Sequence, residues 1–374
     1  MNEGDDRMSN LKVLRVIYDL QIGGVQRMLL LSLPILRDMG IDTEICCLKG
    51  LGELAEKFKE KEFRLHVAPF KSRFDPVGIV KLRRLAQKGG YDIIHSHMYA
   101  SNMAVNAALF GKKNIRIVNS YHSQRPFHGA PQKRKAAWLK SIPDKIVAVS
   151  EAVLKPVLEN GFPEEKTIII HNGIKCPDHP STLPEVPADS PLRLIWAGRF
   201  VKQKRVEMLV DIAEACRNEN IPVHITIVGD GPTFQRVKAS IKEKTLGDSI
   251  SLTGWKSDIS PYINEAELYI SASNREGFPN TLLEMCARGR GCVVADIPPN
   301  REALGDSGAG LTVKDDLSAW TDALESLYRN RSLIPEMSRK AYKIGQTYTV
   351  ENTCSKTIRM YEELMAEKKK LIAE

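Results

Sequence analysis

The chain has 374 residues, of which 43% are hydrophobic and 27% charged, and its formal net charge is +8. This length suits about two or three domains of ordinary globular composition. No stretch approaches the ~18 consecutive apolar residues of a membrane-spanning helix. The acidic, polar start at residues 1–7 is unlike a secretory signal peptide. We therefore expect a cytoplasmic protein in which residues 1–9 form a disordered tail.

The positive charge is concentrated in residues 101–150, which hold nine basic residues against one acid, Asp144. Such a segment can face an anionic membrane or a phosphorylated substrate, and it can equally be a solvated face with a lopsided charge count. Nucleic acid is disfavoured as a partner because aromatic residues do not interleave with the basic ones. The seven cysteines include no Cys-x-x-Cys pair, so they predict reduced, mostly buried thiols rather than a metal or redox centre.

The first half of the chain alternates strand and helix patterns. Its first strand is expected at Val13–Asp19, which is largely apolar and leads through Gly23 and Gly24 into a helical pattern. Further strands are expected at 43–48, 65–68, 92–95, 115–119, 145–149 and 167–170, and helices at 54–61, 77–87, 100–109, 133–140 and 151–159. This alternation predicts a first domain over residues 10–175, with a parallel sheet covered by helices on both faces.

The segment 176–191 contains five prolines and predicts a linker. Strand patterns then recur at 192–197, 223–228, 250–252, 268–272 and 291–294, which predicts a second domain over residues 192–345. A helical pattern over 346–374 is expected to pack back towards the first domain. The predicted fold class is α/β, with two Rossmann-like, doubly wound parallel-sheet domains facing an interdomain cleft. Ligands are expected beyond the carboxyl ends of the strands.

Several candidate site residues follow the predicted strands. Gly23-Gly24 is either a tight turn or a backbone cradle for phosphate at a helix start. Gly229–Pro232 reads as a turn into a helix and lacks the spacing of the dinucleotide fingerprint. Arg199 and Lys204 are two cations in one loop, which suits a diphosphate but also describes ordinary surface charges. His122 follows a strand, where a lone histidine is more often structural than functional.

The segment Glu276–Glu284 places a Gly-Phe-Pro-Asn turn between a strand pattern and a helical run. A strand, a glycine-bearing loop and a helix in this order present helix N–H groups to a phosphate. The two glutamates can also be a helix-start acid and a surface acid. The residue pattern alone leaves both interpretations open.

Taken together and in order, these motifs resemble the retaining glycosyltransferases of the GT4 class, which have the GT-B fold and a carboxyl-terminal domain of the group 1 type. The resemblance covers nearly the whole chain. The matching segments are Gly23–Arg27, Asp92–His97, Val149-Ser150, Asn172–Ile174, Gly198–Phe200 with Lys204, Val228–Pro232, Gly254-Trp255 and the Glu-x7-Glu segment Glu276–Glu284.

The resemblance implies transfer of a sugar, with retained anomeric configuration, from a nucleotide sugar to a glycan or a lipid-linked, undecaprenyl-type acceptor, in bacterial surface polysaccharide or glycolipid synthesis. UDP is favoured as the nucleotide. The enzyme would work in the cytoplasm or on the inner face of the plasma membrane, which the basic 101–150 region could contact. No cofactor is expected. Because the chain contains no Asp-x-Asp motif, we expect a metal-independent reaction through front-face attack.

The resemblance also assigns roles. Arg199 and Lys204 would hold the diphosphate, and His122 would lie near the donor sugar and acceptor. Glu276 would contact the donor sugar and Glu284 the ribose hydroxyls. The remaining residues implied in donor binding are Gly23, Gly24, Gly229, Trp255, Phe278, Pro279, Asn280 and Thr281.

Two positions depart from the family pattern. Gly291 stands where proline is common, and Arg205 stands where glycine is common. Two other readings compete with a transferase: a UDP-sugar 2-epimerase of the same fold, and a catalytically silent, sugar-nucleotide-binding scaffold. The Glu-x7-Glu segment with the Arg199 and Lys204 pair argues against the epimerase.

Overall fold

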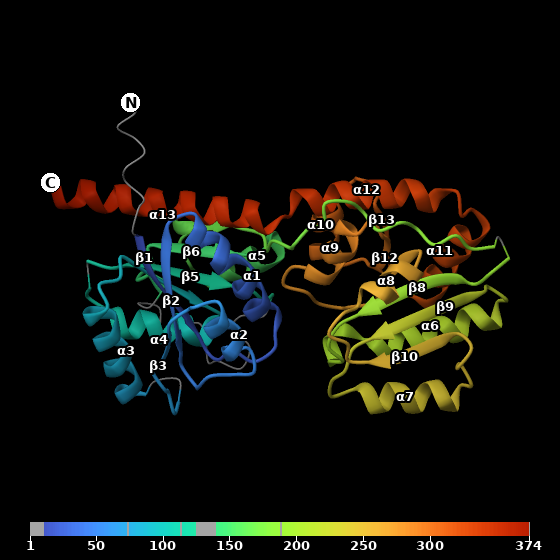
Figure 1. Ribbon diagram of the computed structural model, residues 1–374, viewed down its shortest axis with the longest axis horizontal. Helices are drawn as coiled ribbons and strands as arrows, with labels where there is room; N and C mark the ends of the chain where they lie inside the picture. Colours follow the sequence, from blue (N-terminus) through green and yellow to red (C-terminus); the bar gives the residue numbers. More distant parts are fainter. Residues whose placement is uncertain (1–10, 73–74, 113, 125–139, 188, 374) are drawn as a thin grey trace. The chain divides into compact units, whose positions relative to one another are not determined.

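The computed structural model describes residues 11–72, 75–112, 114–124, 140–187 and 189–373 (Figure 1). Side chains are described up to residue 368. The predicted tail at 1–9, most of the predicted helix at 133–140 and five of the nine basic residues of the 101–150 region lie outside these ranges. The chain divides into two compact units, one of Met1–Gly173 with Val350–Glu374 and one of Ile174–Thr349. In this division, the predicted linker 176–191 falls within the second unit.

The first unit is built on a parallel sheet whose described strands lie in the order β3-β2-β1-β4-β5-β6-β7. The strands are β1 (Leu11–Ile17), β2 (Ile41–Cys47), β3 (Leu65–Val67), β4 (Ile93–His97), β5 (Arg116–Tyr121), β6 (Lys145–Ala148) and β7 (Thr167–Ile169). The described helices are α1 (Gly24–Asp38), α2 (Ala55–Glu60), α3 (Pro76–Lys88), α4 (Tyr99–Leu109), α5 (Glu151–Glu159) and α13 (Val350–Ala373), with a 3-10 turn, η2, at Glu164–Lys166.

Both faces of this sheet are buried, as near-continuous apolar strands require. One core contains Val13 and Ile45 of the sheet together with apolar side chains of α1, α2 and α13. The other contains Leu14 and Cys46 with side chains of α3 and α4. The long helix α13, red in Figure 1, packs against α1 in the first unit although it is the last element of the chain.

The second unit repeats the pattern with a sheet in the order β10-β9-β8-β11-β12-β13, again parallel throughout its described strands. The strands are β8 (Leu192–Ala197), β9 (Val223–Val228), β10 (Ile250–Gly254), β11 (Leu268–Ser271), β12 (Gly291–Ala295) and β13 (Gly310–Val313). The helical elements are η3 (Lys202–Lys204), α6 (Val206–Asn218), α7 (Phe234–Glu243), α8 (Ser260–Glu265), α9 (Asn280–Ala287), α10 (Pro298–Leu304), α11 (Leu317–Arg329) and α12 (Leu333–Thr347). The prediction of two doubly wound parallel-sheet domains is confirmed.

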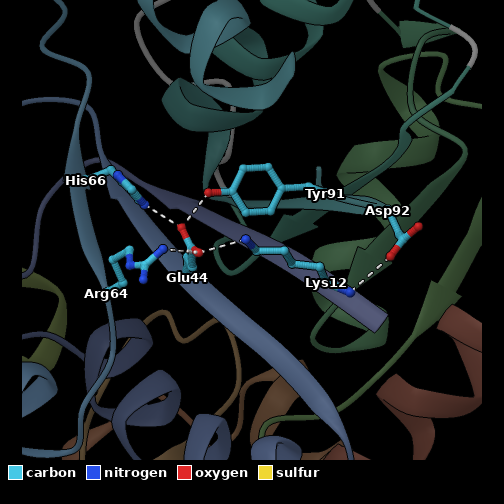
Figure 2. A network of polar contacts seen from close by, with 6 residues as sticks. All are labelled: Lys12, Glu44, Arg64, His66, Tyr91 and Asp92. Atoms are coloured by element: carbon cyan, nitrogen blue, oxygen red, sulfur yellow. Dashed lines mark hydrogen bonds and ion pairs between the residues drawn. The ribbon is translucent and has the colours of Figure 1, made fainter. Parts of the chain in front are cut away.

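A buried carboxylate stabilises the first sheet near the amino ends of β1 and β4 (Figure 2). Glu44 accepts hydrogen bonds from Tyr91 Oη at 2.6 Å and His66 Nε2 at 2.5 Å, and ion pairs join it to Lys12 at 3.0 Å and Arg64 at 3.2 Å. Burial alone would raise the pKa of Glu44, but the hydrogen bonds from Tyr91, His66 and Lys12 outweigh burial and hold the pKa at about 2. The network therefore links β1, β2, β3 and the segment before β4.

Candidate functional site

Because all the strands of the first sheet are parallel, the segments that follow β1, β4 and β5 gather at one edge. After β1 the chain turns through Gly23 into α1, whose first turn contains no acidic side chain. The Gln26 side chain donates back to the Asp19 carbonyl at 3.2 Å and closes this turn. Gly23 and Gly24 thus lie at the amino end of α1, where a helix has unpaired N–H groups and the positive end of its dipole; whether they bind phosphate stays a prediction.

A cluster of buried polar side chains lies beside this turn. The Arg15 guanidinium, on β1, reaches two histidines of β4: Nη1 is 2.8 Å from His95 Nδ1 and 3.3 Å from His97 Nε2. His97 Nδ1 lies 3.2 Å from Nε2 of His122, the residue after β5. Tyr361, from α13, contacts His95 Nδ1 at 2.6 Å. His122, a site residue predicted from the sequence, is thus the last residue in a hydrogen-bonded series that runs from Arg15 through His97.

The rings of this cluster are held neutral. Burial first, and then the charge of Arg15, lower the pKa of His95 and His97 well below the usual histidine range. The same two causes lower the pKa of His122 to about 4. At neutral pH each ring therefore carries one proton and offers one donor and one acceptor nitrogen.

His122 lines two cavities. A small cavity is lined by Arg15, His95, His97 and His122 together with apolar residues. A second pocket, of about 600 Å³, lies at the carboxyl ends of β1, β4 and β5 and is lined by Tyr18, Asp19, Phe70, Lys71, Tyr99, His122 and neighbouring residues. Polar, aromatic and charged groups around a pocket of this size suit a carbohydrate-sized ligand.

The second sheet gathers the remaining predicted residues at its own carboxyl edge. The turns after β8 and β9 pack so closely that a Cβ atom at Gly229 would lie 1.9 Å from the carbonyl oxygen of Gly198. Gly229 also has a φ of +144°, which disfavours any residue with a side chain. Glycine at this position is therefore required for the two turns to sit together beside Arg199, whose side chain is exposed.

The same edge brings two predicted catalytic residues into contact. Lys204 Nζ lies 2.7 Å from Glu276 Oε1, although the residues belong to different loops, and both side chains are largely buried, at 20% and 11% exposure. Backbone bonding supports the pair, because Asn274 N donates to the Gln203 carbonyl at 3.1 Å. The loop after β11 is therefore held against η3 with a paired cation and carboxylate.

The other members of the Glu276–Glu284 segment have distinct environments. Phe278 is buried, and its ring packs on Tyr348 with centroids 5.3 Å apart, so its side chain anchors the loop. Pro279 caps α9, which starts at Asn280 and Thr281 and has no acidic residue in its first turn. Glu284 is half-buried one turn further along this helix. The start of α9 therefore follows Glu276 by four positions in the same loop segment.

Trp255 lies at the carboxyl end of β10, on the edge of the second sheet, and is 58% exposed. Among the residues whose positions are described, no group of three or more His, Cys, Asp or Glu side chains is arranged to hold a metal ion. Within the same residues, none of the helices combines the length and apolar composition needed to cross a bilayer.

Sequence reasoning did not connect Arg15 or Tyr361 with His95, His97 and His122, although His95 and His97 lie in a segment that matches the family. One signal was present: Arg15 is a charged residue inside an otherwise apolar strand pattern, and such a residue needs a buried partner. The alternation of His95 and His97 along β4 gives a second signal, because residues two apart on a strand share a face. Tyr361 could not be found this way, since it is 266 positions from His95.

Known proteins match both halves of the chain. Residues 22–176 match the family described as Glycosyltransferase Family 4, and residues 191–330 match the family described as Glycosyl transferases group 1. The capsular polysaccharide biosynthesis glycosyltransferase CapH of Staphylococcus aureus is 23% identical over 353 residues, which cover 90% of this chain and 96% of CapH.

Two further comparisons agree with this assignment. The N-acetylgalactosamine-N,N'-diacetylbacillosaminyl-diphospho-undecaprenol 4-alpha-N-acetylgalactosaminyltransferase of Campylobacter jejuni is 24% identical over 344 residues, covering 87% of this chain and 91% of that protein. The crystal structure of HepE from Anabaena, in complex with UDP, superposes with a TM-score of 0.77 at 15% identity and covers 94% of this chain and 100% of HepE. Two matching family domains in the expected order, on two sheets of the expected topology, confirm the family that the ordered motifs indicated: the chain is a glycosyltransferase of the GT4 family with the GT-B fold.

Proposed function

We propose that this glycosyltransferase moves a sugar from a UDP-sugar to a glycan or an undecaprenyl-type, lipid-linked acceptor, with retention of configuration, in bacterial surface polysaccharide or glycolipid synthesis. The observation that carries the proposal is the largely buried Lys204–Glu276 pair, 2.7 Å apart in the loops that precede α6 and α9. A cation and a carboxylate at one sheet edge, with the positive end of a helix dipole in the same loop segment, are what a sugar diphosphate needs.

The pair suggests how the donor binds. Without donor, Lys204 and Glu276 neutralise each other. A diphosphate beside Lys204 would compete for its ammonium group, and Glu276 would then accept hydrogen bonds from the hydroxyls of the donor sugar. Arg199 would bind the second phosphate, with Gly229 allowing close approach, and Glu284 would hold the ribose hydroxyls. Trp255 offers an exposed ring after β10 of the same sheet, and the amides of Phe278–Thr281 would complete this half of the site.

The chemical step needs stabilisation of the charge that develops on the departing diphosphate. Fixed cations and amide dipoles supply this stabilisation without reorganising during the reaction. We therefore infer a metal-independent reaction with front-face attack, in which Arg199, Lys204 and the helix amides of α9 take the role that a metal ion has elsewhere. The leaving phosphate would help to remove the proton of the acceptor hydroxyl.

The acceptor belongs in the first unit on this proposal. The pocket of about 600 Å³ at the carboxyl ends of β1, β4 and β5 is large enough for a sugar ring and combines Asp19 and Lys71 with aromatic walls. The Campylobacter relative is named for an undecaprenol-linked substrate, which supports a lipid-linked acceptor, and the UDP bound to HepE supports a uridine nucleotide. The CapH name supports a role in surface polysaccharide synthesis.

A donor screen tests this function. The purified protein is incubated with UDP- and GDP-sugars, with and without a lipid-diphosphate sugar acceptor, and nucleotide release and product anomer are followed by NMR. We expect release of UDP, stimulated by acceptor, and a product with the anomeric configuration of the donor. Accumulation of a free epimerised sugar without acceptor would indicate an epimerase, and UDP binding without turnover on any acceptor would indicate a silent scaffold.

If the acceptor is bound to a membrane, the basic 101–150 region can hold the enzyme at the lipid surface. We infer that this region contacts anionic lipid, which predicts binding to liposomes containing phosphatidylglycerol that weakens as salt increases. Liposome binding that is absent, or equal at low and high salt, would contradict this inference.

A further inference from the structure

The buried polar cluster of the first unit determines which nitrogen of His97 carries the proton. A guanidinium group has only N–H donors and stays protonated in proteins. Arg15 Nη1 lies 3.3 Å from His97 Nε2, so this ring nitrogen must accept the hydrogen bond. Because the neutral ring has one donor and one acceptor nitrogen, the proton of His97 lies on Nδ1.

The same reasoning extends from His97 to His122. His97 Nδ1 lies 3.2 Å from His122 Nε2, and since His97 Nδ1 donates, His122 Nε2 accepts. The single proton of His122 therefore lies on Nδ1. Burial and the Arg15 charge lower the pKa of both rings, which keeps each ring at one proton at neutral pH.

The last hydrogen-bond donor of this series, the Nδ1–H group of His122, indicates a ligand. His122 Nδ1 is buried and, among the described residues, has no hydrogen-bond partner. His122 also lines the pocket of about 600 Å³ at the carboxyl edge of the first sheet. A buried N–H group without a partner is costly, and the cost is removed when a bound molecule supplies an acceptor oxygen.

We propose that Arg15 and His97 are positioning residues that hold His122 as its Nδ1–H tautomer, so that His122 donates a hydrogen bond to an oxygen of the bound sugar substrate. The inference rests on the proposed function only for the identity of that ligand. One chemical consequence follows. A neutral imidazole that presents an N–H group to the substrate cannot take up a proton at that nitrogen, so His122 orients the substrate and does not act as a general base.

Side-chain NMR measures the tautomer without any assay of transfer. The full chain is labelled with ¹⁵N-histidine, and long-range ¹H–¹⁵N spectra at neutral pH identify the protonated nitrogen of each ring, with the His122→Gln spectrum supplying the assignment. We expect His122 as the Nδ1–H tautomer. Free histidine in water favours Nε2–H, so the observation of Nε2–H at His122 would overturn the proposal.

Three variants separate a positioning role from a structural one. His97→Asn keeps an N–H donor close to the place of Nδ1 and should retain the Nδ1–H tautomer of His122. His97→Leu removes the donor and should shift His122 towards Nε2–H. Tyr361→Phe removes a buried hydroxyl of the same cluster outside the Arg15–His97–His122 chain, and the tautomer should not change. An unchanged tautomer in His97→Leu would refute the proposal, and circular dichroism confirms that each variant is folded.

Kinetics supply the second readout. We expect kcat/KM to fall roughly tenfold in His97→Leu, the effect of one hydrogen bond of ordinary strength, and to stay within about twofold in His97→Asn. Equal losses in the two variants would mean that His97 only fills space, and the positioning role would be rejected. If the wild type shows the Nδ1–H tautomer but transfers no sugar to any acceptor, the proposed function fails while the proton arrangement stands.

Discussion

At the scale of single residues, the most informative contact is the ion pair between Lys204 and Glu276. Their side chains are largely buried, so removing one partner leaves the other without its ion pair in a mostly buried place. A ligand that separates the pair must replace both partners. On the proposed function a sugar diphosphate would do so, because its phosphate would meet the ammonium group and its hydroxyls would meet the carboxylate.

Removing either member of this pair should abolish transfer. For Lys204→Ala we expect a loss of about 100-fold or more in kcat, since a fixed cation near the leaving group is lost. Glu276→Ala should cost a similar factor. Lys202→Ala is the matched control, because Lys202 is an exposed lysine of the same short turn, η3. Wild-type rates in Lys204→Ala or Glu276→Ala, measured by UDP release, would remove these residues from the site.

Glu44 should give the first unit a defined pH dependence. Its pKa is about 2 in the folded chain, against roughly 4.3 for an ordinary glutamate. The folded pKa is the lower one, so the stabilisation is fully present above about pH 4.3 and is lost as the pH falls through 2. At neutral pH the contribution is on the order of 3 kcal/mol.

The Glu44→Gln variant tests this dependence. At pH 7 we expect a clearly lower midpoint in urea unfolding than for the wild type, and the difference between the two proteins should shrink between about pH 4 and pH 2. Comparing the proteins at each pH cancels the contributions of all other carboxylates. A difference that stays constant over this range would show that Glu44 is not held ionised by its neighbours.

At the scale of elements, the shape of the second sheet's carboxyl edge depends on how closely the turns after β8 and β9 pack. Gly229 follows β9, and its Cα faces the carbonyl oxygen of Gly198, which follows β8. No side chain can be added there without moving backbone that carries Arg199. The shape of the candidate diphosphate site is therefore set by glycine positions as much as by charged residues.

Gly229→Ala should accordingly impair both stability and donor binding. We expect destabilisation on the order of 2 kcal/mol, because a Cβ would lie 1.9 Å from a backbone oxygen, and weaker binding of UDP. Gly247→Ala is the control, since nothing lies within 4 Å of the Cβ that it would add. Thermal unfolding and isothermal titration with UDP measure the two effects. Equal behaviour of the two variants would contradict the packing argument.

The helix α13 is the clearest case of an element placed by packing rather than by chain order. Its buried face includes Tyr361 and Leu364, which join the core beside α1. Leu364→Ala should lower the stability of the first unit by about 2–4 kcal/mol through the cavity it leaves. Glu363→Ala changes the exposed neighbour and should be nearly neutral. A loss of stability in both variants, or in neither, would show that this face does not pack as described.

At the scale of the whole molecule, the two units repeat one architecture and carry different candidate site residues. The first holds the histidine cluster and the pocket of about 600 Å³, and the second holds Arg199 and the Lys204–Glu276 pair, which we propose bind the donor. Both sets follow the carboxyl ends of parallel strands, where α/β sheets bind ligands.

The whole reaction is expected to run without a metal ion. Transfer by the full-length protein should be unchanged in EDTA, because protein cations and helix amides stabilise the leaving diphosphate in the proposed mechanism. Magnesium added back should not raise kcat. Activity that disappears on chelation and returns with a divalent ion would overturn the metal-independent mechanism.

Much of the fold could be predicted from the sequence, for a physical reason. Apolar runs such as Val223–Val228, followed by helical spacing, identify buried parallel strands wherever they occur. The motif residues Lys204 and Glu276 were also found in the sequence, because their loops carry local signals. Their contact was not, since 72 positions separate them.

The sequence by itself determined the family, the two-fold repetition of the architecture and the identity of most candidate donor residues, because strand periodicity, turn glycines and motif order are local properties. Only the tertiary structure decided which of those residues meet. It paired Lys204 with Glu276, placed Arg15 against His95 and His97, and put Tyr361 of α13 beside β4. Such contacts depend on how the strands pair and on which helix covers which face, and these follow from the packing of the whole core rather than from any single segment.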